Sequence, residues 1–275
     1  MIISIDPAHS LSDSLEIKLE TEAKKVAKNL YAAEIDPAKA VEEYKEKLAP
    51  QIEKIDFLKG SGLEDTFDIA GMAPGIDEIA AFDRFLRYMH SNEYDIIIFD
   101  TAPTGHALRF LSLPEVLDSW LGKMIKLRLR FSGMINTLKK VLPFGKGESD
   151  TKFGTEQLEE MKHRIEKARE IMSDPNKTHY NLVLIPEMMS ILESERSLKV
   201  LNEYRIPTET IIVNMLIPEN PHCKFCTERR KQQLERVEMI KKKFKDYKIL
   251  QLHLFRNEVK GIKMLAGVSK ILFEA

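Results

Sequence analysis

The sequence predicts an α/β fold, with a mainly parallel β-sheet flanked by helices and a helical insertion. Short apolar runs rich in Ile, Val and Leu alternate with longer stretches of helical periodicity, and near-continuous apolar runs are typical of strands covered on both faces. This alternation favours parallel strands joined by right-handed crossovers. With 275 residues, 43% hydrophobic and 31% charged, the chain can bury a sizeable core. We therefore treat 1–275 as a single domain.

Five apolar runs are the expected strands. The first begins at Ile2 and leads directly into Asp6. The other four are Asp95–Phe99, Leu182–Ile185, Thr210–Val213 and Ile249–Leu254. Helical periodicity lies between and after them, at Ile76–His90, Ser190–Tyr204, Cys226–Tyr247 and Val259–Phe273.

The region 110–176 shows helical periodicity without a strand signal, so we predict a helical insertion subdomain there. Within it, apolar residues recur at alternating steps of four and three, which places them on one helix face. This apolar stripe comprises Trp120, Met124, Leu127, Phe131, Met134 and Leu138. In one interpretation the stripe packs against the domain's own core. In the other it forms a groove for an apolar helix, because flexible Met side chains suit varied partners.

Charge and cysteine content narrow the classes of partner. The 42 Lys and Arg residues nearly balance 43 Asp and Glu residues, so no overall field attracts nucleic acid. The helical stretch after Cys226 is locally basic and indicates either a solvated face or a docking surface for a membrane receptor's acidic tail or lipid headgroups. No aromatic residues interleave as in nucleic-acid-binding segments, so we expect no nucleic acid. Two cysteines, no signal peptide and no apolar stretch of about 20 residues favour a cytoplasmic protein.

Two aspartates stand where chemistry is expected in a parallel sheet, at the carboxyl ends of strands. Asp100 follows an apolar run, an arrangement that holds Mg²⁺ in P-loop nucleotide hydrolases. Thr101 offers a hydroxyl and Gly105 lets the backbone approach a phosphate, although a simple Pro-Gly loop also explains this stretch. Asp6 either braces the turn that Ser10 caps or orients a water attacking a γ-phosphate.

Cys223 and Cys226 form a Cys-x-x-Cys pair that supplies half of a tetrahedral zinc site. A symmetric homodimer would bring two such pairs together across its axis. A thioredoxin-like redox pair and two incidental thiols are the alternatives.

Four motifs occur in one order along the chain. They are Asp-Pro-Ala-His-Ser at 6–10, Asp-Thr-Ala-Pro-Thr-Gly-His at 100–106, Val-Asn at 213–214 and Cys-Lys-Phe-Cys at 223–226. In these motifs the chain resembles the ArsA-type ATPases, which comprise arsenical pump-driving ATPases and cytosolic targeting factors for tail-anchored membrane proteins. The resemblance runs from residue 2 to near the C-terminus.

The resemblance implies a P-loop NTPase-like fold of the SIMIBI type that uses ATP and Mg²⁺. It implies that Asp6 positions the attacking water, that Asp100 serves Mg²⁺ and that Asn214 reads adenine. The remaining nucleotide-binding positions would be Ser10, Thr101 and Gly105. For the targeting branch it also implies Zn²⁺ shared across a homodimer, a client's hydrophobic transmembrane helix as partner and a possible membrane receptor.

One central part of this family's site is absent from the sequence. A phosphate-binding loop reads G-x-x-x-x-G-K-[ST], and neither Gly122-Lys123 nor Gly145-Lys146 fits this pattern. Either the start codon was placed too late or the chain is a truncated paralogue that has lost hydrolysis, and we favour the first explanation. We expect the chain as written to bind ATP weakly and to hydrolyse it negligibly, because the loop supplies most of the charge neutralisation.

Three functions follow from these motifs. The first is a targeting factor whose helical insertion shields a client's membrane helix. The second is an arsenite-transport energising ATPase, which is disfavoured because no cysteine lies near the Asp100 loop or the insertion to bind As(III). The third is a nucleotide-independent paralogue that binds apolar helices.

Overall fold

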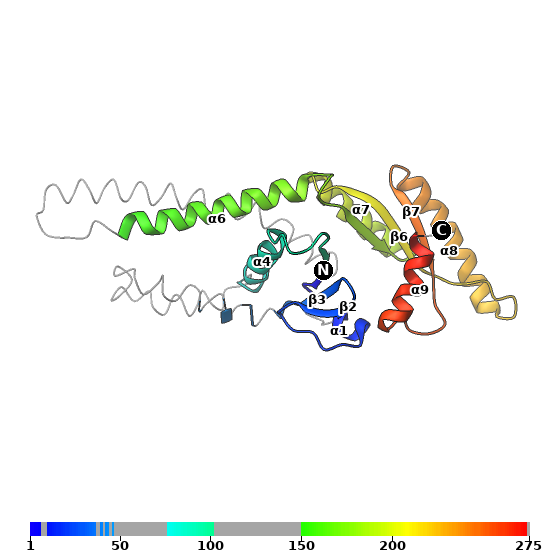
Figure 1. Ribbon diagram of the computed structural model, residues 1–275. Coiled ribbons are helices and arrows are strands. Elements are labelled where there is room, and N and C mark those ends of the chain that lie inside the picture. Colours follow the sequence, from blue (N-terminus) through cyan, green and yellow to red (C-terminus); the bar gives the residue numbers. More distant parts are fainter. Residues whose placement is uncertain are drawn as a thin grey trace, which may run out of the picture.

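The computed structural model describes residues 1–6, 10–36, 39–40, 42–43, 46, 76–101 and 150–273. Across these residues the α/β prediction is confirmed, because mostly parallel strands are flanked by helices (Figure 1). The helices are α1 (Ser10–Leu15), α4 (Ile76–Met89), α6 (Asp150–Ser173), α7 (Met188–Glu203), α8 (Lys224–Lys243) and α9 (Gly261–Phe273).

The first sheet contains strands whose carboxyl ends carry acidic residues. Its strands are β1 (Ile2–Ser4), β2 (Lys24–Ala27), β3 (Leu30–Glu34) and β4 (Ile98–Asp100). They lie in the order β2-β3-β1-β4, with β1 parallel to both β3 and β4. In this register Ser4 is paired with Glu34 on one side and with Asp100 on the other. The sheet therefore brings its carboxyl strand ends together around Ser4.

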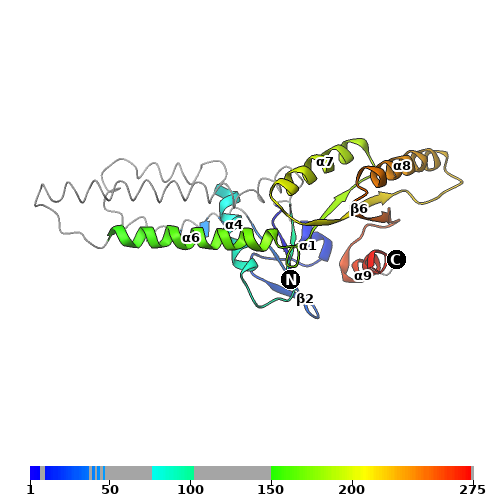
Figure 2. The same cartoon turned by 90° about the horizontal axis from the view of Figure 1, so that it is seen from above.

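The second sheet is entirely parallel and has the order β5-β6-β7. Its strands are β5 (Tyr180–Leu184), β6 (Thr208–Leu216) and β7 (Lys248–His253). In Figure 2, α7 and α8 lie on one side of β6 and α9 lies on the other. The helices α7 and α8 contact β5 and β6 respectively, as expected for crossover helices between parallel strands.

One hydrophobic cluster joins both sheets. Ile3 from β1, Ile165 from α6 and Ile211 from β6 all belong to it, and each is fully buried. A second, smaller cluster packs Leu11 and Leu15 of α1 against Ala32, and side chains of α9 lie against it. The helix α9 thus bridges β7 and α1.

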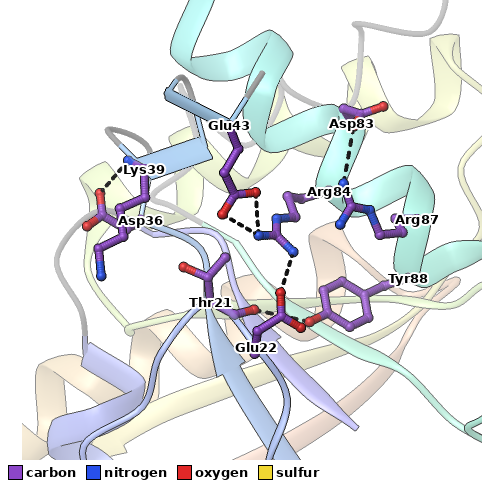
Figure 3. Close-up of polar contacts among 9 residues, drawn as sticks. All are labelled: Thr21, Glu22, Asp36, Lys39, Glu43, Asp83, Arg84, Arg87 and Tyr88. Atoms are coloured by element: carbon purple, nitrogen blue, oxygen red, sulfur yellow. Dashed lines mark hydrogen bonds and ion pairs between the residues drawn. The ribbon is translucent and has the colours of Figure 1, made fainter. Parts of the chain in front are cut away.

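Ionic contacts of the buried Arg84 attach α4 to residues on either side of the β2-β3 hairpin (Figure 3). The buried Arg84 guanidinium donates to Glu22 at 3.0 Å and to a Glu43 oxygen at 2.6 Å. Tyr88 donates its hydroxyl to the Thr21 carbonyl at 3.1 Å. Of the three charged residues only Arg84 is buried, since the side chains of Glu22 and Glu43 are 81% and 45% exposed. The two carboxylates keep the buried guanidinium paired, because a buried charge without a partner is costly, and in this way they help to hold α4 in place.

The insertion is helical where the structure describes it. Helix α6 projects away from both sheets and leads into β5 (Figure 1), and Arg164 of α6 pairs with Asp83 of α4 at 3.4 Å. The apolar stripe lies outside the described residues, and the subdomain limits 110–176 stay a prediction. No helix within the described ranges is long and apolar enough to cross a membrane.

The structure differs from the sequence prediction in two respects. A hairpin, β2-β3, stands where no strand was predicted; its two-residue connection places Asn29 at φ 56°, a conformation that Asn tolerates well. The single predicted sheet is divided in two, because no described strand pairs with the outer side of β4 or of β5. Apolar side chains stay exposed beside these edges, namely Ile96 (70%), Ile98 (54%) and Val183 (57%).

Replacing these exposed side chains should improve solubility without loss of stability. We expect Ile98→Thr/Val183→Thr to reduce light scattering of the concentrated protein, because apolar edge strands promote association. Its unfolding temperature should stay within about 2 °C of wild type. The matched control Ile211→Ala, at a fully buried position, should lose about 2–5 kcal/mol. Equal scattering by the double variant and wild type would contradict the prediction.

Candidate nucleotide and magnesium site

Three carboxyl groups stand at neighbouring carboxyl ends of the first sheet. Glu34 ends β3, Asp100 ends β4, and Asp6 follows β1 between them. The backbone hydrogen bonds of the sheet continue past these ends, since Ile5 N–H donates to the Asp100 carbonyl at 2.9 Å and Ile35 N–H donates to the Ser4 carbonyl at 2.9 Å. The strand ends are therefore fixed relative to one another, and the prediction that Asp6 and Asp100 share one edge of the sheet agrees with this geometry.

A hydrogen bond to β1, the strand that precedes it, holds Asp6 in place. Its N–H donates to the Ser4 hydroxyl oxygen at 3.3 Å, and Ser4 is fully buried. Asp6 itself is half-buried, whereas Ser10, which begins α1, is exposed. Thr101 is half-buried directly after Asp100, and Gly105 lies outside the described residues.

Glu34 is a buried residue of this cluster that the sequence analysis missed. Only 4% of it is exposed, and its carboxylate accepts from the Ser12 N–H at 2.7 Å and from the Ser12 hydroxyl at 2.5 Å. A polar residue that ends a strand next to Asp6 could have been suspected from Glu34-Ile35-Asp36, but only after the hairpin had been recognised.

The three carboxyl groups repel one another electrostatically. Burial raises the pKa of the Asp100 carboxyl above its ordinary value, and the charges of Asp6 and Glu34 raise it further. Asp100 still reaches solvent at the sheet edge, so a bound cation could approach it. In the described part of the chain, the three acids do not form a group that could hold a metal ion by itself. Mg²⁺ usually takes one or two carboxylates and completes its shell with water and substrate phosphates, so the exposed Asp100 is the carboxylate here that fits this cation.

Asn214 lies on the second sheet, near the carboxyl end of β6. Its side-chain oxygen accepts from the Met215 N–H at 2.8 Å, and Met215 has φ 59°. The strand pairing is irregular between Val213 and Leu216. From α8, the buried Gln233 accepts from Ile217 N–H at 2.8 Å and donates to the Met215 carbonyl at 3.2 Å. Gln233 was not predicted, because a polar residue in a basic helix carries no distinct signal.

Cys223 and Cys226 lie at the start of α8. Cys223 is the N-cap residue, and its sulfur accepts from the Cys226 N–H at 3.3 Å. Both thiols are free and half-exposed. Hydrogen bonds from the Cys226 side chain and backbone lower the pKa of Cys223, while the same pairing raises the pKa of Cys226. No group of three or more metal-ligating side chains occurs among the residues that the structure describes.

Comparison with known proteins agrees with this arrangement. The family model described as anion-transporting ATPase, ArsA_ATPase, matches residues 1–274. The chain belongs to the ArsA-type ATPase family. It is 37% identical over 275 residues to ATPase get3 of Schizosaccharomyces pombe, covering 99% of this chain and 81% of the relative. It is 34% identical over 298 residues to ATPase GET3B of Arabidopsis thaliana, covering 100% of this chain and 71% of that relative.

Membership of the ArsA-type family gives the carboxylate cluster a chemical context. A member of an ATPase family uses a nucleotide and Mg²⁺, and the cluster at the ends of β1, β3 and β4 is the part of the described structure whose charge suits that cation. The resemblance noted in the sequence is thereby confirmed over the whole chain. The roles of the individual residues stay predictions.

Neutralising Asp100 should stabilise the ligand-free protein at neutral pH. Its pKa is raised in the folded state, so the protonated carboxyl favours folding, and this contribution is lost as the pH rises from about 3.9, the unfolded pKa, through the folded pKa. Asp100→Asn cannot ionise, and we expect it to unfold at a higher temperature than wild type at pH 7, with the difference shrinking toward pH 4. Thermal unfolding followed by circular dichroism measures this.

The matched control is Asp246→Asn, which removes one carboxylate at an exposed position between α8 and β7. It should leave the unfolding temperature unchanged at both pH values. An Asp100→Asn protein less stable than wild type at pH 7 would show that the ionised carboxylate is favourably paired, contrary to the prediction.

Proposed function

We propose that this protein is a cytoplasmic, ATP-dependent targeting factor that binds and delivers tail-anchored membrane proteins. The observation that carries the proposal is the convergence of Asp6 and Asp100 at adjoining strand ends in a chain whose similar proteins are named ATPase get3 and GET3. In this proposal the helical insertion receives the client's transmembrane helix. The described part of the insertion, α6, is consistent with that arrangement.

In this proposal the strand ends position the reacting groups. Asp100 would hold Mg²⁺, which would neutralise charge on the phosphates, and the half-buried Asp6 would orient the water that attacks the terminal phosphate. Ser10 and Thr101 contribute hydroxyls, and Gly105 allows close approach of the backbone. MgATP would be the substrate, and attack of this water on its terminal phosphate would give ADP and inorganic phosphate. Asn214 reads the adenine through the amide that now accepts from Met215 N–H.

The 275 residues contain no G-x-x-x-x-G-K-[ST] phosphate-binding loop, and the lysine and backbone N–H groups of such a loop normally neutralise the phosphates. The ATP-dependent step of the proposal therefore depends on such a loop. Client binding depends on the insertion instead.

Client capture tests the targeting function directly. The chain, co-expressed with a protein bearing a C-terminal transmembrane helix, should co-purify with it from the soluble fraction. We expect Met124→Ser/Phe131→Ser/Met134→Ser to reduce the captured client at least about tenfold, because each buried apolar side chain contributes about 1.5–3 kcal/mol. The control Met189→Ser removes an exposed methionine of α7 and should leave capture unchanged. No complex with wild type, or equal capture by the triple variant, would refute the function.

Zinc shared between two chains is the second part of the proposal. The Cys223 and Cys226 sulfurs start one helix and supply two thiolate ligands, and a second copy would complete a tetrahedral Cys₄ site. We expect about one zinc per two chains by metal analysis, and Cys223→Ser/Cys226→Ser should lose both the zinc and the dimer in light scattering. His222→Ala, next to the pair, is the control and should keep both. A zinc-free wild type or a dimeric cysteine variant would exclude a shared zinc site.

A further inference from the structure

The buried carboxylate of Glu34 binds the start of α1. Both of its oxygens bind the same residue, since one accepts from the Ser12 N–H at 2.7 Å and the other from the Ser12 hydroxyl at 2.5 Å. A carboxylate that is only 4% exposed is costly to bury unless such hydrogen bonds replace its water. Each carboxylate oxygen of Glu34 therefore accepts from one donor of Ser12.

Ser12 also binds the backbone of the segment that follows α1. Its hydroxyl oxygen donates its proton to Glu34 and accepts from the Leu19 N–H at 3.1 Å, and its carbonyl accepts from the Ile17 N–H at 3.1 Å. A helix of six residues is too short to be stable by itself. One serine side chain thus links the end of β3, the first turn of α1 and the segment that follows α1.

Two of the candidate site residues, Asp6 and Ser10, lie next to these contacts. Asp6 N–H donates to the buried Ser4 hydroxyl at 3.3 Å. Ser10 opens a helix whose third residue, Ser12, is bound to Glu34. Leu11 and Leu15 pack on Ala32 of β3 next to this link. The segment Ser10–Ser12 is therefore held against the end of β3.

We propose that Glu34 is a positioning residue that, acting through Ser12, sets the segment Ser10–Ser12 at the start of α1 in the position required for nucleotide binding. Its effect on nucleotide rests on the function proposed above, whereas its effect on the segment does not. Glu34 touches no reacting atom in this role. A glutamine could not replace it, because its amide group would donate toward a Ser12 hydroxyl whose own proton would then lose its acceptor.

Amide hydrogen exchange on the purified 275-residue protein tests the positioning. Charged hydrogen bonds of this kind contribute about 1.5–3 kcal/mol, so Glu34→Gln should accelerate exchange at the Ser12 and Leu19 amides at least about tenfold. Amides of β6 should keep their wild-type rates. Ser12→Ala should reproduce the acceleration at Leu19, and the double variant should add little to it. Glu20→Gln, an exposed carboxylate in the same region, is the control and should change neither.

The nucleotide readout separates positioning from mere stability. In the wild type, Mg²⁺ with millimolar ATP should slow exchange at Ser10 and Leu11, and Glu34→Gln should lose this protection. Accelerated exchange spread equally over β6, unchanged exchange at Ser12 and Leu19, or full protection by MgATP in Glu34→Gln would each overturn the proposal. If the wild type shows no protection by MgATP while the local acceleration is present, the ATP-dependent function fails and the positioning of the segment stands.

Discussion

The parallel pairing of β1 between β3 and β4 is the constraint on which the rest of the site depends. This register sets Ser4 beside both Glu34 and Asp100 and carries Asp6 to the same edge. Parallel strands end at one edge of a sheet, so acidic residues at three consecutive ends necessarily lie close to one another. The pairing thereby creates a local excess of negative charge in a chain whose overall charge is close to zero.

Two of the three acids, Glu34 and Asp100, are stabilised differently in the presence of this repulsion. Glu34 is buried and satisfied by Ser12, so its charge is held in place by hydrogen bonds. Asp100 is at the open edge, and its pKa is raised by burial and by its two acidic neighbours. Strain of this kind costs folding free energy in the absence of a ligand and is recovered when a cation binds. Glu34 therefore helps to hold the framework through Ser12, and Asp100 is the acid that would meet the cation in the proposed function.

The sequence was sufficient for the elements with long apolar or helical patterns and for the aspartates at their ends. β5, β6, β7, α4, α7 and α8 were predicted within a few residues, because local periodicity dominates such segments. The β2-β3 hairpin was missed since Lys24–Ala27 is polar and half-exposed, and Glu34 was missed with it. The division into two sheets could not be predicted from periodicity, because strand pairing depends on contacts between residues far apart in the chain.

The second sheet shows how one helix links two features that the sequence treated separately. The helix α8 begins at the Cys223 cap and, further along, its Gln233 binds the backbone on either side of the bend that follows Asn214. Arg230 of the same helix also donates to the Ile217 carbonyl at 2.5 Å. These part-buried hydrogen bonds hold α8 against the end of β6. One helix therefore fixes both the cysteine pair at its start and the backbone that follows Asn214.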